Sequence, residues 1–170
     1  MAKIKKSKGT IGILTGGGDV PGLNPAIRAV TFREILEGYR VIGFRRGWSV
    51  LIDIERNSKH DNSNNFMELS QVVVNKAART GGTFLHTSRT RASHVSKLMV
   101  PAHLRDTYDK EINDLTPEVI KNLNWLGVDY LIAIGGDDTL SYAVHLFKKG
   151  VKVMAIPKTM DNDVPGTDYC

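Results

Sequence analysis

Carboxylates gather at two places in the second half of the 170-residue chain. Asp137 and Asp138 follow two glycines, and Asp161 and Asp163 follow closely after Lys158. Magnesium in proteins prefers carboxylate oxygens together with phosphate oxygens. A lysine supplies positive charge to a developing phosphoryl group, and a carboxylate can take a proton from a substrate hydroxyl. These residue types therefore predict phosphoryl transfer, which depends on positioning and charge neutralisation.

A strand, helix, strand unit is predicted to position these carboxylates. Residues 130–134 and 151–156 are apolar runs rich in branched side chains, which is typical of buried parallel strands. Residues 139–149 predict a helix from the apolar spacing of Leu140, Val144 and Phe147, with Gly150 closing it. Such a crossover puts both strands in one sheet, pointing the same way. The two acidic turns should then meet at the edge where open α/β sheets bind ligands.

A glycine-rich turn near the N-terminus offers a second phosphate-binding feature. Residues 10–15 predict a strand, residues 16–18 are all glycine, and Pro25 fits the first position of a helix that ends at Gly38. Glycines admit a phosphate close to the backbone, and a helix N-terminus offers free N–H groups. A tight turn without a ligand explains the same pattern equally well.

Arginines beside hydroxyl groups form a third such feature. Residues 81–91 hold two glycines, several hydroxyl side chains, Arg89 and Arg91. A guanidinium offers several fixed donors and stays charged at any working pH, which suits phosphate. Taken alone, this stretch is better explained as a surface turn with solvated arginines.

The remaining chain indicates one α/β domain. Residues 39–44 predict a second strand, and the polar, asparagine-rich residues 54–65 predict a surface loop. Residues 94–114 predict an inserted loop or an irregular helix. Thr116 is the expected cap of a further helix, with Pro117 at its first position, an apolar face of Val119, Ile120, Leu123 and Leu126, and Gly127 at its end. The alternation of predicted strands and helices indicates a three-layer, mostly parallel, Rossmann-like sheet over residues 10–170, preceded by a basic tail at 1–9.

Composition excludes several classes of protein. The net charge of +5 permits an anionic partner, but no recognition helix or interleaved aromatic side chains indicate nucleic-acid binding. No apolar run is long enough for a membrane span, and no secretory signal is present. The single cysteine, Cys170, allows no internal disulfide, so a cytoplasmic protein is expected. The histidines His86, His94 and His103 have no metal-site spacing.

Four stretches in order resemble the motifs of the phosphofructokinase family, which phosphorylates fructose 6-phosphate at its 1-hydroxyl. They are TGGGDVPGLNPAIR, GGTFLHTSR, IGGDDT and PKTMDNDVPGTDY, and the similarity runs from about Ile11 to Cys170. A GGD turn alone also occurs in related NAD and lipid kinases. The order of all four makes the resemblance specific.

The resemblance implies a role for each matching position. Asp161 matches the catalytic base, with Asp163 beside it, and Asp137 matches the magnesium ligand. Gly17 contacts the phosphoryl donor, and Arg89 matches an arginine that bridges the reacting phosphates. The other donor-site positions are Gly18, Gly136, Asp138 and Thr139, and those that would touch the sugar phosphate are Thr159 and Asp161. For each aspartate the alternative is a helix cap or a turn residue.

Two positions point to the phosphoryl donor. ATP-using members usually have glycine where this chain has Asp138 and Lys158, and members with aspartate and lysine there resemble the pyrophosphate-dependent branch. Asp138 would place a carboxylate near the α-phosphate of ATP, and like charges about 4 Å apart repel by about 4 kcal/mol at an intermediate dielectric. Pyrophosphate has no α-phosphate, and Lys158 would offset charge on the transferred and leaving phosphates. The predicted reaction converts pyrophosphate and fructose 6-phosphate to phosphate and fructose 1,6-bisphosphate.

Members of the family are about twice as long as this chain or more. The resemblance therefore implies an N-terminal piece that carries the donor and magnesium half of the site, without the second, sugar-phosphate-binding domain and inactive alone. The full-length protein is expected to form homo-oligomers. Two other functions stay open: an ATP-dependent phosphofructokinase, and a non-catalytic protein that binds phosphate or oligomerises.

Overall fold

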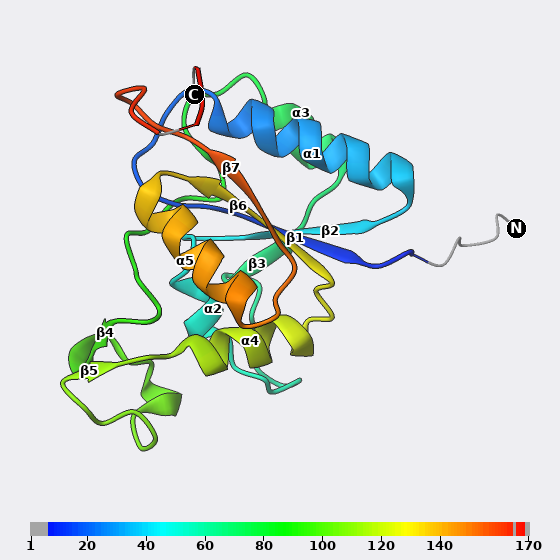
Figure 1. Cartoon of the computed structure of the whole chain (residues 1–170). Helices are drawn as coiled ribbons and strands as arrows, with labels where there is room; N and C mark the ends of the chain where they lie inside the picture. The colour runs from blue at the N-terminus through cyan, green and yellow to red at the C-terminus, as the bar shows by residue number, and fades with distance from the viewer. Residues whose placement is uncertain (1–6, 165, 169–170) are drawn as a thin grey trace, which may run out of the picture.

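The computed structural model describes residues 7–164 and 166–168, and its core is a five-stranded sheet (Figure 1). The strands of this sheet are β1 (Thr10–Thr15), β2 (Arg40–Phe44), β3 (Phe66–Glu68), β6 (Tyr130–Gly135) and β7 (Val153–Pro157). The helices are α1 (Leu23–Glu37), α2 (Val50–Asp53), α3 (Gln71–Ala77), α4 (Thr116–Trp125) and α5 (Asp137–Lys148).

The sheet is mostly parallel, as the sequence predicts. Its strand order is β3-β2-β1-β6-β7, and only the edge strand β3 runs antiparallel to its neighbour. β6 and β7 are paired in parallel with Gly135 opposite Pro157, and β1 is paired with β6 up to Thr15 and Ile134. The carboxyl ends of β1, β6 and β7 therefore lie side by side, at the edge where the predicted turns begin.

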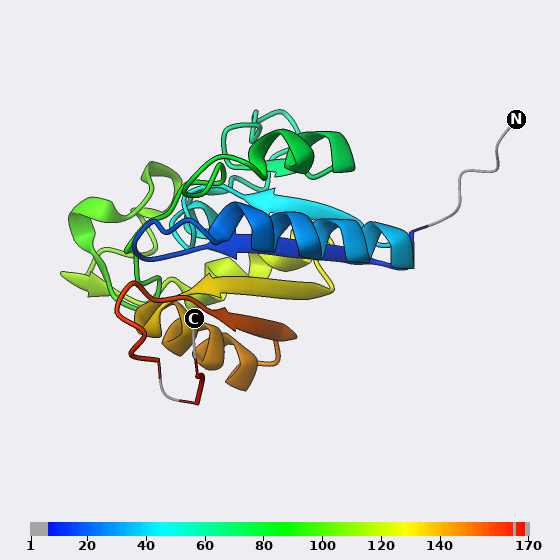
Figure 2. The ribbon, with the colours of Figure 1, turned by 90° about the horizontal axis from the view of Figure 1, so that it is seen from above.

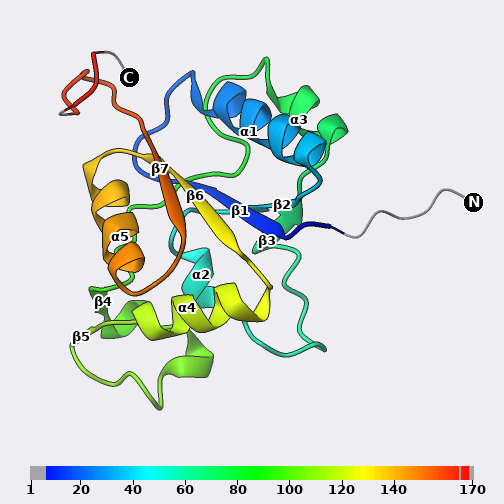
Figure 3. The ribbon, with the colours of Figure 1, turned by 45° about the vertical axis from the view of Figure 1, so that its right-hand side comes forward.

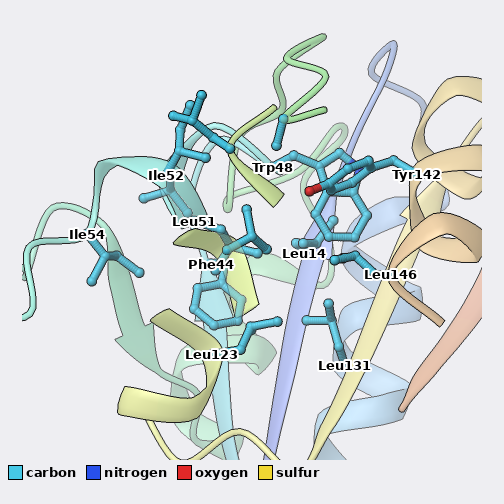
Figure 4. Packing of buried hydrophobic residues seen from close by; sticks show 14 of the residues in the cluster. Leu14, Phe44, Trp48, Leu51, Ile52, Ile54, Leu123, Leu131, Tyr142 and Leu146 are labelled. Atoms are coloured by element: carbon cyan, nitrogen blue, oxygen red, sulfur yellow. The ribbon is translucent and has the colours of Figure 1, made fainter. Parts of the chain in front are cut away.

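Helices cover both faces of the sheet, which gives the predicted three layers. Figures 1 and 3 show α1 and α3 on one face and α2, α4 and α5 on the other. Alternate residues of each strand point to opposite faces, so the strands feed two separate cores. Ile13 and Ile27 belong to the core under α1, whereas Leu14 and Leu146 belong to the core under α5. Figure 4 shows the second core, where Phe44 of β2 lies beside Leu123 of α4.

The helix α5 is confirmed, but the apolar residues whose spacing predicted it are not the ones that it buries. Val144 and Phe147 are 51% and 65% exposed, whereas Tyr142, Ala143 and Leu146 are buried against the sheet. These three buried residues also have helical spacing, and Tyr142 is the large side chain among them. The amphipathic pattern therefore fixed the helix and not the side that it buries.

The strand β7 is confirmed as parallel, but it is not buried as predicted. It lies at the edge of the sheet and is paired on one side only, with β6. Met154 is 57% exposed in consequence. An edge position leaves a row of unpaired backbone groups, which proteins usually protect.

Several predicted boundaries shift by one or two residues. The helix α1 begins at Leu23, so Pro25 is its third residue, and Gly38 with φ 93° ends it as predicted. Thr116 begins α4 but does not cap it: the N-cap residue is Leu115, and the Thr116 N–H donates to Asp114 Oδ1 at 2.9 Å. The predicted apolar face of α4 is confirmed, since Val119 and Leu123 are buried.

The segment 94–114 forms a small arm beside the sheet instead of an irregular helix. It contains two short antiparallel strands, β4 (Val95–Ser96) and β5 (Ile112–Asn113), and two 3-10 turns, Lys97–Met99 and Ala102–Leu104. Figure 2 shows this arm lying next to the carboxyl end of the sheet. Residues 54–65 form the predicted loop, without helix or strand.

The predicted basic tail is mostly outside the described residues, which begin at Ser7. The N–H of Lys8 donates to the Gly38 carbonyl at 3.0 Å, so the last part of the tail is held against the end of α1. Within residues 7–164 and 166–168, no helix has the length and apolar character needed to cross a membrane.

Candidate donor and magnesium site

Four turns enclose a hollow of about 470 Å³ at the carboxyl edge of the sheet. The turns follow β1, β2, β6 and β7, and the stretch around Arg89 forms a further wall. The predicted site residues that line this hollow are Gly17, Gly18, Arg89, Gly136, Asp137, Asp138, Thr139 and Lys158. Segments far apart in the sequence thus meet at one place.

A second hollow of about 260 Å³ adjoins the first. Its lining includes the remaining predicted residues, Thr159, Asp161 and Asp163. Both hollows share Gly18, Arg89, Gly136, Asp137 and Lys158. The two acidic turns therefore face a common space, as expected from the parallel pairing of β6 with β7.

Backbone hydrogen bonds hold these turns in register. The Gly16 N–H donates to the Ile134 carbonyl at 2.9 Å, which joins the turn after β1 to the end of β6. The Lys158 N–H donates to the Gly135 carbonyl at 3.0 Å, which joins the end of β6 to the turn after β7. These bonds extend the sheet pairing into the turns, so the geometry of the hollow follows from the strand order.

The N-terminus of α5 opens toward the larger hollow. The first amides of a helix lack intrahelical partners, and no side chain caps this helix at Gly136. Free amides and the helix dipole favour an anion there. Asp137 and Asp138 in the first turn are exposed, so their carboxylates stand in solvent at the mouth of the hollow.

Lys158 bridges the first and last of these turns. Its side chain is only 9% exposed, and its ammonium donates to the Gly18 carbonyl at 2.7 Å. Gly17 sits close by with φ 79°, a backbone conformation that favours glycine. One buried ammonium therefore lies between the glycine turn and the acidic turns, where it can neutralise charge on a bound phosphate.

The two aspartates of the last turn have different surroundings. The Thr159 hydroxyl donates to Asp163 Oδ1, and the Asp161 N–H donates to the Thr159 hydroxyl oxygen at 3.1 Å. Over the part of the chain that the structure describes, the Asp161 carboxylate accepts no hydrogen bond. Asp163 is thus engaged in shaping the turn, whereas the Asp161 carboxylate is available to a ligand.

The acidic residues fit magnesium only as a partial ligand set. Among the described residues, no group of three acidic, histidine or cysteine side chains is placed to hold a metal by itself. Asp137 and Asp161 nevertheless line the same hollow. Magnesium usually keeps several waters and is bound by one or two carboxylates together with substrate phosphates. Two carboxylates in one hollow match this coordination.

Sequence reasoning missed part of the wall of the larger hollow. The missed residue is Trp48; the lining also includes Ser88, Thr90 and Arg91, which belong to the stretch of arginines and hydroxyl groups at 81–91. Trp48 packs edge-on against Tyr142, with ring centroids 4.9 Å apart (Figure 4). Burial raises the pKa of Tyr142 above its ordinary value, and its hydroxyl hydrogen-bonds the Thr116 hydroxyl. The signal for Trp48 was its place in a glycine-containing turn after a parallel strand.

Asn24 is a second missed residue, and it acts behind the site. Its side chain is 1% exposed in the first turn of α1. Its amide donates to Thr80 Oγ1 at 3.0 Å and its carbonyl accepts from the Phe84 N–H at 2.9 Å. Both contacts fix residues 80–84, the start of the stretch that carries Arg89 to the hollow.

Fold and hollows together describe an α/β protein suited to an anionic ligand at the carboxyl edge of its sheet. The chain belongs to the phosphofructokinase family, whose sequence profile, described as Phosphofructokinase, matches residues 10–170. The structure of Pichia pastoris phosphofructokinase in the T-state superimposes with a TM-score of 0.73 at 26% identity, covering 96% of this chain and 16% of that one. The resemblance found in the sequence is therefore confirmed, as is the mostly parallel fold.

Two curated relatives have different phosphoryl donors in their names. A pyrophosphate–fructose 6-phosphate 1-phosphotransferase of Dictyoglomus thermophilum is 38% identical over 163 residues, 96% of this chain and 39% of the relative. ATP-dependent 6-phosphofructokinase 2 of Clostridium perfringens is 40% identical over 169 residues, 99% of this chain and 41% of the relative. The chain thus spans about two-fifths of the length of these relatives. The two relatives, similar to this chain to nearly the same degree, therefore do not distinguish the two donors.

Proposed function

We propose that this chain forms the donor and magnesium half of a phosphofructokinase site that uses pyrophosphate. The observation that carries the proposal is the shared lining of the two hollows by Asp137, Lys158 and Arg89, with Asp161 in the smaller one. Phosphoryl transfer needs an anion cradle, neutralising charge and a base within one space.

The proposed roles combine the family resemblance with the place of each residue in the two hollows. Gly17, Gly18 and the free amides at Gly136 cradle the donor phosphates, and Arg89 spans both hollows to hold the group in transfer. The Asp161 carboxylate takes the proton from the 1-hydroxyl of fructose 6-phosphate as the hydroxyl oxygen bonds to phosphorus. The bond from phosphorus to the bridging oxygen breaks, and inorganic phosphate leaves with the electron pair, close to Lys158.

Two further side chains position the substrate side. Asp163 accepts a hydrogen bond from Thr159, which keeps that turn in the shape that presents Asp161.

Magnesium, when bound through Asp137, would neutralise charge on the donor phosphates. The ammonium of Lys158 is buried, so water screens its charge less than that of an exposed lysine.

Asp138 supports pyrophosphate as the donor. Its carboxylate lines the larger hollow at the N-terminus of α5. A nucleoside triphosphate would bring an additional phosphate toward this side chain, whereas pyrophosphate would not. Removal of this carboxylate should therefore favour ATP.

One observation favours the ATP-dependent alternative. A more apolar hollow of about 420 Å³ shares Arg89, Thr90 and Arg91 with the larger one and is lined by Val95, Met99 and Ile112. An apolar recess next to an anion site can accept a purine base. ATP is therefore the second candidate donor.

A comparison of the two donors tests the proposal. Titration calorimetry of the 170-residue chain with pyrophosphate and with ATP, each with magnesium, should show tighter binding of pyrophosphate. Because the chain is proposed to form only half of the site, it should form no fructose 1,6-bisphosphate from fructose 6-phosphate, and turnover at a normal rate would contradict that part of the proposal. Equal or tighter binding of ATP would contradict the donor assignment, and absence of binding by either donor would contradict the site.

The broader organisation is also proposed. Residues 10–170 would be the donor-binding domain, and contacts with the sugar phosphate beyond Thr159 and Asp161, assembly into oligomers and a cytoplasmic location are proposals for the whole protein. They rest on membership of the family.

A further inference from the structure

Thr139 packs tightly between two glycines at the bottom of the larger hollow. Its side chain is 4% exposed in the first turn of α5. An ideal Cβ on Gly16 would lie 2.3 Å from its Oγ1, 2.9 Å from its Cγ2 and 3.2 Å from its Cβ. An ideal Cβ on Gly135 would lie 2.6 Å from its Cβ. Neither glycine can therefore carry a side chain while Thr139 keeps its place.

These glycines are the points where the two phosphate-facing turns leave the sheet. Gly16 follows β1 and precedes Gly17, and Gly135 ends β6 and precedes Gly136; Gly17 and Gly136 both line the hollow. Over the described residues Thr139 makes no side-chain hydrogen bond. Packing is thus the contact by which its side chain acts on both turns.

We propose that Thr139 is a positioning residue that fixes the spacing of the two glycine turns, and so the width of the donor hollow, through its volume. This differs from a role as a ligand of the donor phosphates, which would depend on the hydroxyl. The inference rests on the proposed donor site, because the width of the hollow matters only if a phosphate binds there. Close-packed interiors transmit such contacts, since they leave no space for a shift.

A double-mutant cycle tests the packing without a ligand. Gly16→Ala should lower the urea midpoint of unfolding, and Thr139→Ala in the same chain should recover most of the loss. The second substitution removes the two closest atoms and leaves only the 3.2 Å contact. Gly135→Ala should not be recovered by Thr139→Ala, because the Thr139 Cβ that it meets at 2.6 Å remains. The proposed packing of Thr139 against the two glycines would be overturned by additive effects of Gly16→Ala and Thr139→Ala on stability. It would also be overturned if Thr139→Ala recovered the stability of Gly16→Ala and Gly135→Ala equally.

Binding of magnesium pyrophosphate separates positioning from direct contact. Thr139→Val keeps the shape and should keep the Kd within about threefold, whereas Gly16→Ala should weaken binding about tenfold or more and Thr139→Ala should restore it. Gly22→Ala is the matched control, since a Cβ there meets nothing within 4 Å. If Thr139→Val abolishes binding while Thr139→Ser retains it, the hydroxyl is a ligand and the proposal is wrong. If the unsubstituted chain binds no pyrophosphate, the donor assignment fails. The double-mutant cycle of urea unfolding still decides whether Thr139 packs against the two glycines as proposed.

Discussion

Asp138→Asn tests the donor choice with the smallest change of shape. The side chain lines the larger hollow and is exposed at the start of α5. A carboxylate about 4 Å from a phosphate charge costs about 1 kcal/mol in water and about 4 kcal/mol at a dielectric constant of 20. Because water reaches Asp138, we expect about 1–2 kcal/mol, which corresponds to a factor of about 5–30 in the ratio of the affinities for ATP and pyrophosphate.

The assay is a pair of calorimetric titrations of each variant, one with magnesium ATP and one with magnesium pyrophosphate. Asp138→Gly should shift the ratio in the same direction as Asp138→Asn, at a further cost of up to about 1 kcal/mol in stability from glycine in a helix. Asp109→Asn removes an exposed carboxylate that does not line these hollows and serves as the control. A ratio that stays the same in Asp138→Asn and Asp138→Gly would refute the electrostatic reasoning.

Three further changes test other parts of the account. Lys158→Gln should weaken pyrophosphate binding about 10-fold or more in calorimetry, because it removes the ammonium that bonds Gly18; unchanged affinity would exclude its role. Burial opposes ionisation of Glu118, but hydrogen bonds from Lys121 and Arg56 outweigh it and lower its pKa below its ordinary value. The ionised Glu118 therefore contributes fully to the free energy of unfolding above the ordinary pKa of a glutamate, and this contribution is lost as pH falls through the lowered pKa. Over that acidic range, Glu118→Gln should lose less stability in urea unfolding than the unsubstituted chain; an equal loss would contradict this. Phe147→Ser should change the free energy of unfolding in urea by less than about 0.5 kcal/mol, since the ring is 65% exposed; a large loss of stability would show that the ring is packed.

The sequence was informative wherever one local pattern sufficed. The apolar runs that became β1 and β6 are central strands, buried on both faces, so their composition identifies them. Parallel pairing then brought Asp137 and Asp161 to one hollow. Glycines at Gly38 and Gly150, with φ 93° and 92°, likewise marked the ends of α1 and α5.

Properties that depend on neighbours could not be predicted in this way. The composition of β7 resembles that of a central strand, and only the strand order reveals its place at the edge. The buried side of α5 includes Tyr142, whose ring packs edge-on against Trp48 from a distant turn, a contact that the helix pattern does not reveal. The arm at 94–114 has no hydrophobic period to read, because its strands have two residues each.

The hidden supports of the site were missed for the same reason. Asn24 is an ordinary polar residue in the sequence, and its importance comes from hydrogen bonds to residues 56 and 60 positions away. Thr139 was predicted to contact the donor and lines the larger hollow, but the sequence does not reveal that a Cβ on Gly16 or Gly135 would meet its side chain. Motifs indicate which residues meet a ligand more readily than which residues hold the others in place.

The magnesium dependence of pyrophosphate binding tests the central claim most directly, namely that carboxylates and an ammonium from neighbouring strands hold one metal-bound donor. Calorimetric titration with pyrophosphate should show binding with magnesium that weakens strongly when the metal is chelated. Asp137→Asn should remove most of that dependence without lowering the urea midpoint of unfolding. Equal affinity with and without magnesium, or full metal dependence in Asp137→Asn, would contradict the account.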